Sequence, residues 1–594
     1  MERLREVSET TLLGVGRSLS GKRWRQRSGD DRLGLALAQR LGIPEVMGRI
    51  IAARGIEAET VERYLSPTLR DFLPDPSRLK DMDEAVARLA RAVEQGELIA
   101  VFGDYDVDGA TSSALLQRYL SALGARIRLY IPDRRLEGYG PNSAAFARLQ
   151  REGASLVVTV DCGTTAHQPL EDARAMGLDV IVIDHHAAEP KLPPATALVN
   201  PNRLDDDSGE GSLAAVGVTF LVVVGLNRAL RAAGRTVPDL MQYLDLVALG
   251  TVCDVVPLVG LNRALVAQGL KIMAGRRNAG MVALADGAGV SERLDAYHLG
   301  YVLGPRVNAG GRVGRSDLGC RLLSTDAADE ARRLAFELEQ LNGERREIEA
   351  VVLEQAIAQV EQEGTGGGAV VIAHGADWHP GVIGIVAGRL KDRYNRPSCV
   401  IAWEAGVGKG SGRSIAGIDL GAAIIAARQA GHLLGGGGHR MAAGFSLAQA
   451  ALAGFAGFLG ARIGAASEGT DWTPELGIDG LLQVGAATPD LCTMLAGLGP
   501  FGSGNAEPRF VLPMLRVVKA DVVGANHVRC ILAPGAGVER LKAIAFRALD
   551  TELGKALLQS GGAALHVAGH LRADTWQGRN GVQLLIEDAA FAHG

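Results

Sequence analysis

The sequence is poor in cysteine pairs, in long apolar runs and in aromatic residues, and each shortage excludes a class of protein. Its six cysteines form no CxxC pair, which argues against a zinc site or a disulfide framework and favours a reducing cytoplasm. The longest apolar run, Val216 to Leu226, is well short of the roughly 20 residues that span a bilayer, so we expect a buried helix and no membrane contact. Charges interrupt the N-terminus, which predicts no signal sequence.

An excess of positive charge is also missing. The net charge is -5, so any surface that binds nucleic acid must be local. Aromatic residues make up 4% of the chain, which leaves few side chains for stacking on bases. With 594 residues, 47% of them hydrophobic and 22% charged, the chain is expected to fold into roughly three or four domains.

The order of apolar runs predicts the domain organisation. Short β-rich runs alternate with helical stretches after residue 98, which is typical of an α/β domain with a parallel sheet. Strand-like runs at short spacing near the C-terminus indicate a small β-barrel or sandwich. The expected segments are a helical or extended lead-in (1–80), an α/β domain (81–325), a long connecting helix (326–363), a second, smaller α/β domain (364–465) and a β-rich domain (470–594).

Acidic residues and histidines follow several strands of the first α/β domain. In an open parallel sheet, the carboxyl ends of the strands meet at one edge, where ligands bind. A single Asp after a strand is common at turns and helix N-caps, and the DxDxD pattern alone would not predict a site. The presence of Asp or His after several strands of the same domain does predict one. The residues that it brings to this edge are Asp104, Asp106 and Asp108 after the first strand, Asp161 after another, Asp184, His185 and His186 after a third, and Asp254 after a helical run.

So many carboxylates around one crevice repel one another unless a cation balances them. Carboxylates with one or two imidazoles suit Mn²⁺ or Mg²⁺. Two such ions, roughly 3.5–4 Å apart, would serve phosphoryl chemistry. The sequence therefore predicts a two-metal centre. His167, on the helix after Asp161, is expected to be a solvated residue.

Two glycine-dense segments lie in the second α/β domain, GSGRSI (410–415) and GGGGHRMAAGF (435–445). Loops of this kind expose backbone N–H groups and allow close approach to phosphate oxygens. Close packing of helices is the alternative explanation for the later glycines. The candidate phosphate donors are Ser411, Arg413, Ser414 and His439. A guanidinium can donate two parallel hydrogen bonds to one phosphate group, a bidentate contact.

The acidic pattern resembles the DHH phosphoesterase superfamily, whose name describes the triplet Asp184-His185-His186. The resemblance implies that Asp106 and Asp161 hold one Mn²⁺ or Mg²⁺. It implies a second ion on Asp108, Asp161, His185 and Asp254, with Asp161 bridging. Asp104 is expected to add to this centre. His186 is expected to lie beside the scissile phosphate as an electrostatic or acid partner, with Asp184 in a catalytic role.

Further segments are similar to the RecJ-type exonuclease branch of that superfamily. They are YVLGPRVNAGGRVG (301–314), WHPGVIGIVAGRLKDRYNRPSCVIA (378–402) and GPFGSGNAEPRF (499–510). The likeness implies a substrate-binding DHHA1 domain and a C-terminal OB-fold. It also places Arg306, Asn308 and Arg312 at the cleft, with Arg312 on the substrate phosphate. Cys162 stands where the family more often has Asn, and this departure removes no ligand.

The activity implied by the resemblance is 5′-to-3′ digestion of single-stranded DNA to mononucleotides, in DNA repair and recombination, with a helicase and a single-strand-binding protein as partners. Two alternatives stay open, a phosphodiesterase acting on nanoRNA or cyclic dinucleotides and a catalytically inert Cdc45-like scaffold. The β-rich C-terminal domain argues against the first and the complete ligand set against the second. Candidates for base stacking in that domain are Phe501, Phe510 and Trp576, which are equally typical of a core.

Overall fold

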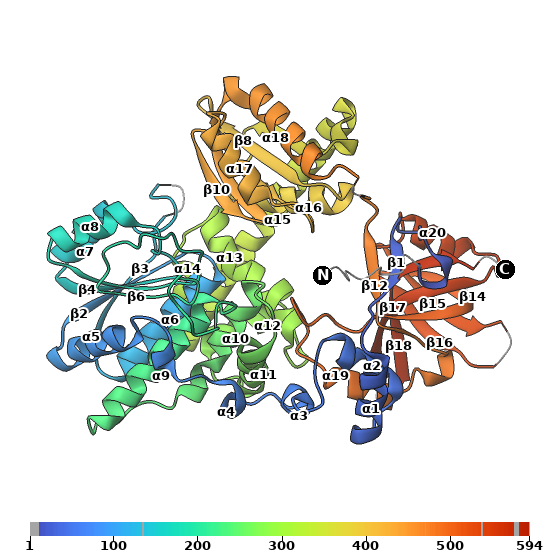
Figure 1. The fold of residues 1–594 in the computed structure, drawn as a ribbon, viewed down its shortest axis with the longest axis horizontal. Helices are drawn as coiled ribbons and strands as arrows, with labels where there is room; N and C mark the ends of the chain where they lie inside the picture. Colours follow the sequence, from blue (N-terminus) through green and yellow to red (C-terminus); the bar gives the residue numbers. More distant parts are fainter. Residues whose placement is uncertain (1–10, 134–135, 470, 536–537, 575–580, 593–594) are drawn as a thin grey trace, which may run out of the picture. The chain divides into compact units, whose positions relative to one another are not determined.

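The computed structural model divides the chain into two compact units (Figure 1). One unit comprises Phe72–Trp472, and the other combines Met1–Asp71 with Thr473–Gly594. The structure describes all residues except 1–10, 134–135, 470, 536–537, 575–580 and 593–594. The expected lead-in, 1–80, therefore falls mostly in the same unit as the C-terminal domain.

The first domain of Phe72–Trp472 contains a sheet of five parallel strands in the order β3-β2-β4-β5-β6. Apart from Leu98 in β2 and Ser155 in β4, these two strands are buried, as expected where helices cover both faces of a parallel sheet. The neighbours of β2 lie on opposite sides of it, so the connections leave β2 and β4 in opposite directions. The strands are β2 (Leu98–Gly103), β3 (Arg126–Tyr130), β4 (Ala154–Val160), β5 (Asp179–Ile183) and β6 (Ala197–Val199).

Helices pack on this sheet and extend the domain beyond it. The apolar run Val216 to Leu226 lies in α9, and the expectation of a buried helix is confirmed. By length and composition α9 would pass as a membrane span, but two thirds of it (67%) is buried inside the unit. The helices are α5 (Met82–Gln95), α6 (Val107–Ala122), α7 (Ser143–Arg151), α8 (His167–Ala175), α9 (Ala215–Ala232), α10 (Leu244–Cys253), α11 (Gly260–Met273), α12 (Ala279–Gly287), η4 (His298–Leu303), α13 (Gly304–Val313) and α14 (Leu318–Ser324).

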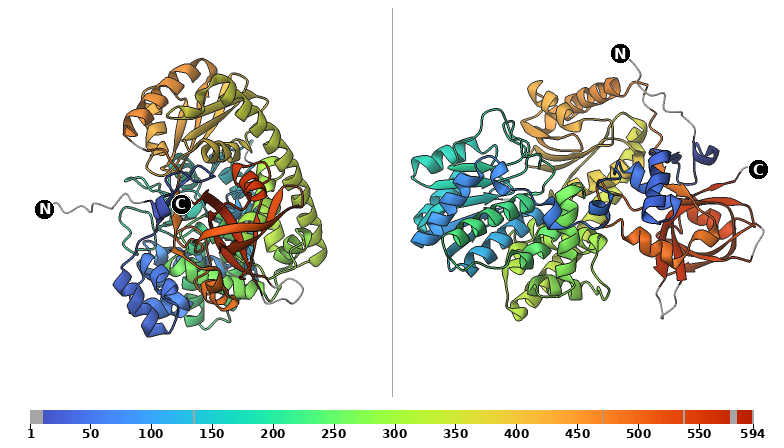
Figure 2. Two further views of the ribbon diagram at one scale, coloured as in Figure 1. Left: turned by 90° about the vertical axis from the view of Figure 1, so that its right-hand side faces the viewer. Right: turned by 60° about the horizontal axis from the view of Figure 1, so that its bottom comes forward.

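The long helix α15 (Ala328–Glu363) leads from this domain to a second one, and Figure 2 shows it from two further directions. The second domain has a five-stranded mixed sheet in the order β10-β11-β9-β8-β7. Its elements are β7 (Val371–Ala376), α16 (Ile383–Tyr394), β8 (Ser398–Glu404), β9 (Val407–Arg413), α17 (Leu420–Gln429), β10 (Gly435–His439), β11 (Ala442–Ala448) and α18 (Leu452–Ala466).

The glycine-dense segments of this domain are strands, and the expectation of loops was wrong. GSGR ends β9, and the later segment forms the hairpin β10–β11, which pairs with β9. The reason is close packing of an aromatic ring. A Cβ on Gly410 would lie 2.1 Å from the ring of Phe445, and one on Gly436 would lie 2.9 Å from its Cβ. Glycine at these positions makes room for Phe445 in the core of this domain.

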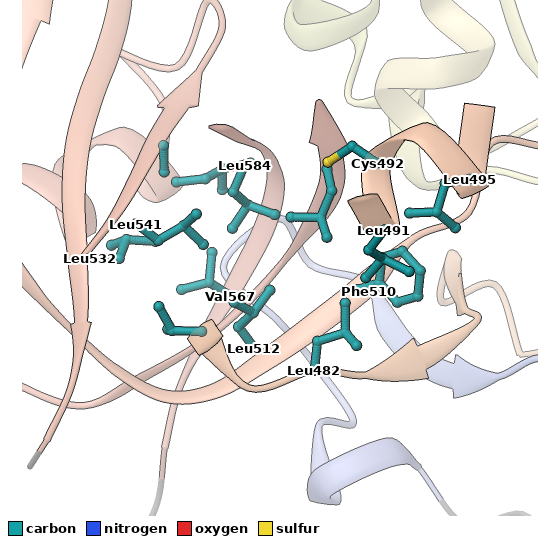
Figure 3. Close-up of a cluster of buried hydrophobic side chains, with 14 of the residues drawn as sticks. Leu482, Leu491, Cys492, Leu495, Phe510, Leu512, Leu532, Leu541, Val567 and Leu584 are labelled. Atoms are coloured by element: carbon teal, nitrogen blue, oxygen red, sulfur yellow. The ribbon is translucent and has the colours of Figure 1, made fainter. Parts of the chain in front are cut away.

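The other unit contains a closed barrel of five strands, in which β17 pairs with both β18 and β14. Figure 3 shows its core, where Phe510 packs with leucines from the strands and from α19 (Pro489–Ala496). Phe510 is fully buried, so it cannot stack on bases. Phe501 packs against the same core, and Trp576 lies outside the described residues. The strands are β14 (Phe510–Val523), β15 (His527–Pro534), β16 (Leu541–Ala545), β17 (Leu565–Asp574) and β18 (Gly581–Phe591), and α20 (Glu552–Gln559) connects β16 to β17.

The N-terminal segment is built into this barrel unit. Strand β1 (Arg23–Gln26) pairs with β12 (Glu475–Ile478). The buried indole of Trp24 donates a hydrogen bond to Asp588 across 2.9 Å. Helices α1 (Asp31–Leu41) and α2 (Glu45–Ala53) add apolar side chains to the barrel core. The expected fold class, a parallel-sheet domain, a connecting helix, a smaller α/β domain and a C-terminal barrel, is confirmed.

Candidate metal centre

The predicted acidic residues gather at the carboxyl edge of the parallel sheet, where the chain segments that follow β2 and β4 run in opposite directions. Asp104 follows β2, Asp161 follows β4 and Asp184 follows β5. This is the point at which open α/β folds bind ligands. Asp254, from the end of α10, joins the same group: its Oδ2 lies 3.6 Å from Nδ1 of His185.

Backbone N–H groups hold two of the carboxylates. Asp106 caps α6 and accepts from the N–H groups of Asp108 and Gly109 at 2.9 and 3.1 Å. Asp108 accepts from Ala215 and Val216 at 2.6 and 2.8 Å. These two donors are the first residues of α9, so the positive end of that helix faces the carboxylate. Both side chains are therefore fixed before any cation binds.

Asp161 has an unusual backbone conformation. Its φ is 60°, in the left-handed region that non-glycine residues rarely adopt. Conformations of this kind cost of order 1–3 kcal/mol and concentrate at functional sites. The hydroxyl of Tyr139 donates to the Asp161 carbonyl across 3.1 Å, and the Tyr139 ring meets the ring of His186 edge-on at 6.1 Å. The turn directs Asp161 into the centre of the group.

A backbone contact orients His185. Its Nδ1 lies 3.1 Å from the carbonyl oxygen of Leu213, to which it donates as a neutral ring. Its Nε2 then carries the lone pair, 3.3 Å from Oδ1 of Asp161 and 3.8 Å from Oδ2 of Asp108. Burial and the charge of His186 lower the pKa of His185 to about 4. A neutral imidazole is the form that binds a metal ion.

The ligand atoms form three overlapping groups, each within 4.8 Å. The groups are Asp104, Asp106 and Asp161; Asp108, His185 and Asp254; and Asp161, His185 and His186. Burial, with the charge of Asp106, raises the pKa of Asp108 to about 7. Burial, with the charge of Asp108, raises the pKa of Asp254 to about 9.

These carboxylates cannot all ionise at neutral pH without positive charge beside them. The pKa of Asp161 is likewise raised well above its ordinary value by burial and by its acidic neighbours. Oδ2 of Asp254 is buried and has no hydrogen-bond donor among the described residues. A divalent cation would supply both the charge and the missing partner. The donor set therefore fits Mn²⁺ or Mg²⁺.

Asp184 has a different task, because its oxygens are occupied. Its Oδ2 accepts from the backbone of Thr164 at 3.0 Å, and its Oδ1 lies 2.7 Å from Nδ1 of His186. Burial opposes the negative charge, but these hydrogen bonds hold the pKa of Asp184 below its usual range. Burial also disfavours a charged His186, yet the bond to Asp184 raises the His186 pKa to about 9. The pair thus places a protonated imidazole beside the acidic groups.

Sequence reasoning missed the residues that support the DHH segment. Asn200, fully buried, donates to the hydroxyl of Thr164 and to the carbonyl of His186, both at 2.8 Å. Asn202 donates to the carbonyl of His185 across 2.5 Å. The signal was present: the apolar run that forms β6 ends in Asn-Pro-Asn, so it too delivers polar side chains to the carboxyl edge. Tyr139 was missed as well, because it lies in a loop without a pattern.

The predicted signature segment forms η4 and α13, and its side chains point in different directions. Arg306 is ion-paired with Glu339 of α15 and donates to the carbonyl of Val302, which gives its guanidinium a structural partner. Arg312 donates to the carbonyl of Gly381 in the second domain across 2.9 Å. Asn308, half-buried, shares a helix face with Arg312, four residues on, and not with Arg306. Catalytic or phosphate-binding roles for all three stay predictions.

The second domain contributes one side chain to the metal centre. The ring of His439, at the end of β10, stacks on that of His186 at 6.3 Å. Arg413 donates to Ser411 across 3.3 Å, and a Cβ on Gly384, at the start of α16, would lie 3.0 Å from each of these side chains. Ser414 is placed elsewhere: its buried hydroxyl donates to the carbonyl of Ile418 across 2.9 Å. Of the four phosphate donors predicted in this domain, Ser414 is the one whose hydroxyl donates to a backbone carbonyl inside the protein.

The parallel sheet, its acidic edge and the facing second domain define a DHH-type phosphoesterase. Residues 98–251 match the DHH family N-terminal domain, residues 352–463 the DHHA1 domain and residues 478–588 the RecJ OB domain. The chain belongs to the RecJ family.

Relatives support this over most of the chain. The single-stranded-DNA-specific exonuclease RecJ of Escherichia coli is 36% identical over 92% of this chain and 96% of its own length. That of Bacillus subtilis is 34% identical over 96% of this chain and 71% of its own length. The structure is similar to that of RecJ from Thermus thermophilus in complex with Mn²⁺, with a TM-score of 0.80 at 32% identity, covering 96% of this chain and 80% of that one. A Mg²⁺ complex of the same protein gives 0.75 at 30%, covering 96% and 79%.

Proposed function

We propose that this chain is a metal-dependent exonuclease that hydrolyses phosphodiester bonds of single-stranded DNA, using two Mn²⁺ or Mg²⁺ ions. The observation that carries the proposal is the overlap of the three ligand groups at Asp161 and His185. Relatives that are named single-stranded-DNA-specific exonucleases, and relatives solved with Mn²⁺ and Mg²⁺, support the substrate and the cofactors. The matching RecJ OB domain, residues 478–588, disfavours a phosphodiesterase for dinucleotides or nanoRNA. The complete ligand set disfavours a Cdc45-like scaffold.

The residues divide into three roles. The proposed ligands are Asp104, Asp106, Asp108, Asp161, His185 and Asp254, with Asp161 shared between the ions. When bound, the ions neutralise the carboxylates, activate water and stabilise charge on the leaving oxygen. His186, protonated and oriented by Asp184, is positioned to balance negative charge on the phosphate. Arg306 and Asn308 are proposed as catalytic residues at the cleft.

A phosphate pocket in the second domain would set the direction of digestion. Ser411, Arg413 and His439 lie on the sheet that brings His439 onto His186, and Arg312 bonds to the loop before α16. A terminal phosphate carries more charge than an internal diester, so it gains more from these donors. With the 5′ phosphate held there, the first diester lies toward the metal ligands. Digestion then runs from 5′ to 3′ and releases mononucleotides.

The decisive experiment uses purified protein, Mn²⁺ and DNA labelled at one end. We expect single strands to be shortened from the 5′ end to mononucleotides, and duplexes with blunt ends to resist. Release from the 3′ end would refute the pocket, and inactivity on every strand with Mn²⁺ and with Mg²⁺ would refute the exonuclease. A role in repair and recombination, a cytoplasmic location, a helicase and a single-strand-binding protein as partners belong to the same proposal, and co-purification from cells tests the partners.

A further inference from the structure

Two tyrosines form an exposed stack on the helix that begins the signature segment. Tyr297 and Tyr301 are 59% and 74% exposed. Their rings lie 5.2 Å apart, centre to centre, at an angle of 30°, which is the geometry of an offset stack. Aromatic residues make up only 4% of the chain, so two of them side by side in solvent call for an explanation.

The helix itself accounts for the exposure. Residues His298–Leu303 form η4, a short π-helix that continues into α13. One side of it is packed: Leu299 and Leu303 are fully buried. Tyr297 and Tyr301 are four residues apart and therefore lie on one face of the helix. This face is exposed to solvent and differs from the packed side. Single π-turns within helices occur frequently at functional sites.

The packed side of this helix rests on the segment that carries a proposed metal ligand. The Sγ atom of Cys253 lies 3.4 Å from the carbonyl oxygen of Leu299. A Cβ on Gly304 would lie 2.5 Å from that sulfur atom, and one on Gly300 would lie 3.4 Å from Val252. The next residue in the chain is Asp254. The packed side of this helix therefore contacts the two residues that directly precede a proposed metal ligand.

The other end of the same helical segment also reaches the acidic group. A Cβ on Gly311 would lie 2.9 Å from the carbonyl oxygen of Tyr105, between Asp104 and Asp106. The segment from Tyr297 to Val313 is therefore fixed at both ends to chain that carries ligands. The tyrosine pair is held in a set position relative to the centre.

The loop that leads into Tyr297 carries an exposed arginine, Arg293, of the kind that binds a phosphate backbone. The loop before Tyr297 and the end of α11 line a cavity of about 300 Å³, to which the exposed Arg277 and Arg293 contribute. The acidic residues of that loop, Glu292 and Asp295, both pair with His298, at 3.2 and 2.7 Å. Cationic side chains next to an aromatic face are the combination that binds single strands without regard to sequence.

We propose that Tyr297 and Tyr301 are a stacking platform for unpaired bases of the DNA strand being digested, beyond the nucleotide that lies over the metal ions. The inference rests on the proposed exonuclease function. Every base has a π-face, so the platform accepts any sequence. In a duplex those faces are covered by neighbouring bases, so the platform selects for single strands. It would also hold the strand between successive cleavages.

The test compares the full-length double variants Tyr297→Ala/Tyr301→Ala and Tyr297→Phe/Tyr301→Phe with the parent protein. Affinity is measured by fluorescence anisotropy on single strands made with phosphorothioate linkages that resist hydrolysis. We expect the alanine pair to bind about tenfold more weakly, as for one lost base stack, and the phenylalanine pair to bind like the parent. Equal affinity of the alanine pair and the parent overturns the platform, and so does a phenylalanine pair as weak as the alanine pair.

A series of strands with one abasic site at successive positions locates the platform and separates it from a loss of fold. The affinity of the parent protein should drop when the abasic site falls at one or two particular positions. The affinity of the alanine pair should not depend on the position of the abasic site. A drop in affinity at the same positions in the alanine pair overturns the proposal. Failure of the exonuclease function itself would look different, because the parent protein would then leave an unmodified single strand intact.

Discussion

Asp184 holds Nδ1 of His186 across 2.7 Å while its other oxygen accepts from the backbone of Thr164. The carboxylate thus orients an imidazole rather than a metal ion. Partners of this kind typically contribute tenfold to a hundredfold to activity. The relationship supports the proposed division of the DHH triplet into a positioning residue, a metal ligand and a charged group for the phosphate.

The first prediction concerns this pair. Asp184→Asn should lower kcat on single-stranded DNA by about tenfold to a hundredfold, because the amide neither orients His186 nor favours its charge. Mn²⁺ should still bind, since the proposed ligands are unchanged, and calorimetry measures this. The control is Asp172→Asn, on the surface of α8, whose partners are Ser143 and Gln168. A kcat equal to that of the control would show that Asp184 has no positioning role.

The second prediction concerns pH and metal removal. Asp108 and Asp254 have pKa values raised to about 7 and about 9. The ordinary pKa of each carboxyl is 3.8, so above about pH 4 the folded protein binds more protons than the unfolded chain and loses stability until pH passes the raised value. In chelator, the Tm should therefore fall from about pH 4 to about pH 9, and Mn²⁺ should restore it. Asp254→Asn should flatten the decline, and a Tm in chelator that does not change with pH would contradict the repulsion.

The third prediction follows from the way the N-terminus folds. Residues 1–71 share a core with the barrel, so removing residues 473–594 alone would expose the apolar faces of α1 and α2. We expect that truncation to aggregate. A fragment of residues 72–472 should instead stay monomeric, cleave short oligonucleotides and bind long strands more weakly, as light scattering, product sizing and anisotropy would measure. Undiminished binding of long strands would show that the barrel has another partner.

Most of the centre could be predicted from sequence because its ligands follow apolar runs. A strand that ends in Asp, and parallel neighbours that end alike, place Asp104, Asp161 and His185 at one edge whatever the details of packing. Asp254 is harder to place, since it follows a helical run and the rule for strand ends does not bring it to this edge. The domain order was predictable for the same reason, because each domain has its own period of apolar residues.

The rest depends on contacts between distant segments, which no local pattern records. The local sequence around Gly410 and Gly436 does not indicate that Phe445 packs against them, so glycine density alone predicts loops where the chain forms a hairpin. Ser414 sits beside Arg413 in sequence, yet the chain turns its hydroxyl inward to Ile418. The pairing of β1 with β12 joins residues more than four hundred positions apart, so the N-terminal segment looked like a separate lead-in.

The last prediction tests the phosphate pocket through the contrast between Arg413 and Ser414. Arg413 lies beside Ser411 and the start of α16, where a guanidinium and a helix N-terminus both favour an anion. Loss of one charged hydrogen-bonding partner costs about 1.5–3 kcal/mol. Arg413→Ala should therefore reduce the preference for 5′-phosphorylated over 5′-hydroxyl single strands by about tenfold or more.

Ser414→Ala supplies the matched control, because its hydroxyl donates to Ile418 inside the domain and is not available to a ligand. That variant should keep the full preference even if its Tm falls, since the measured quantity is the ratio of kcat/KM for two strands that differ only at the 5′ end. Instability lowers both rates and leaves the ratio unchanged. Loss of the pocket lowers one rate only. If Ser414→Ala erases the preference and Arg413→Ala does not, the 5′ phosphate binds elsewhere, and the direction of digestion needs another structural cause.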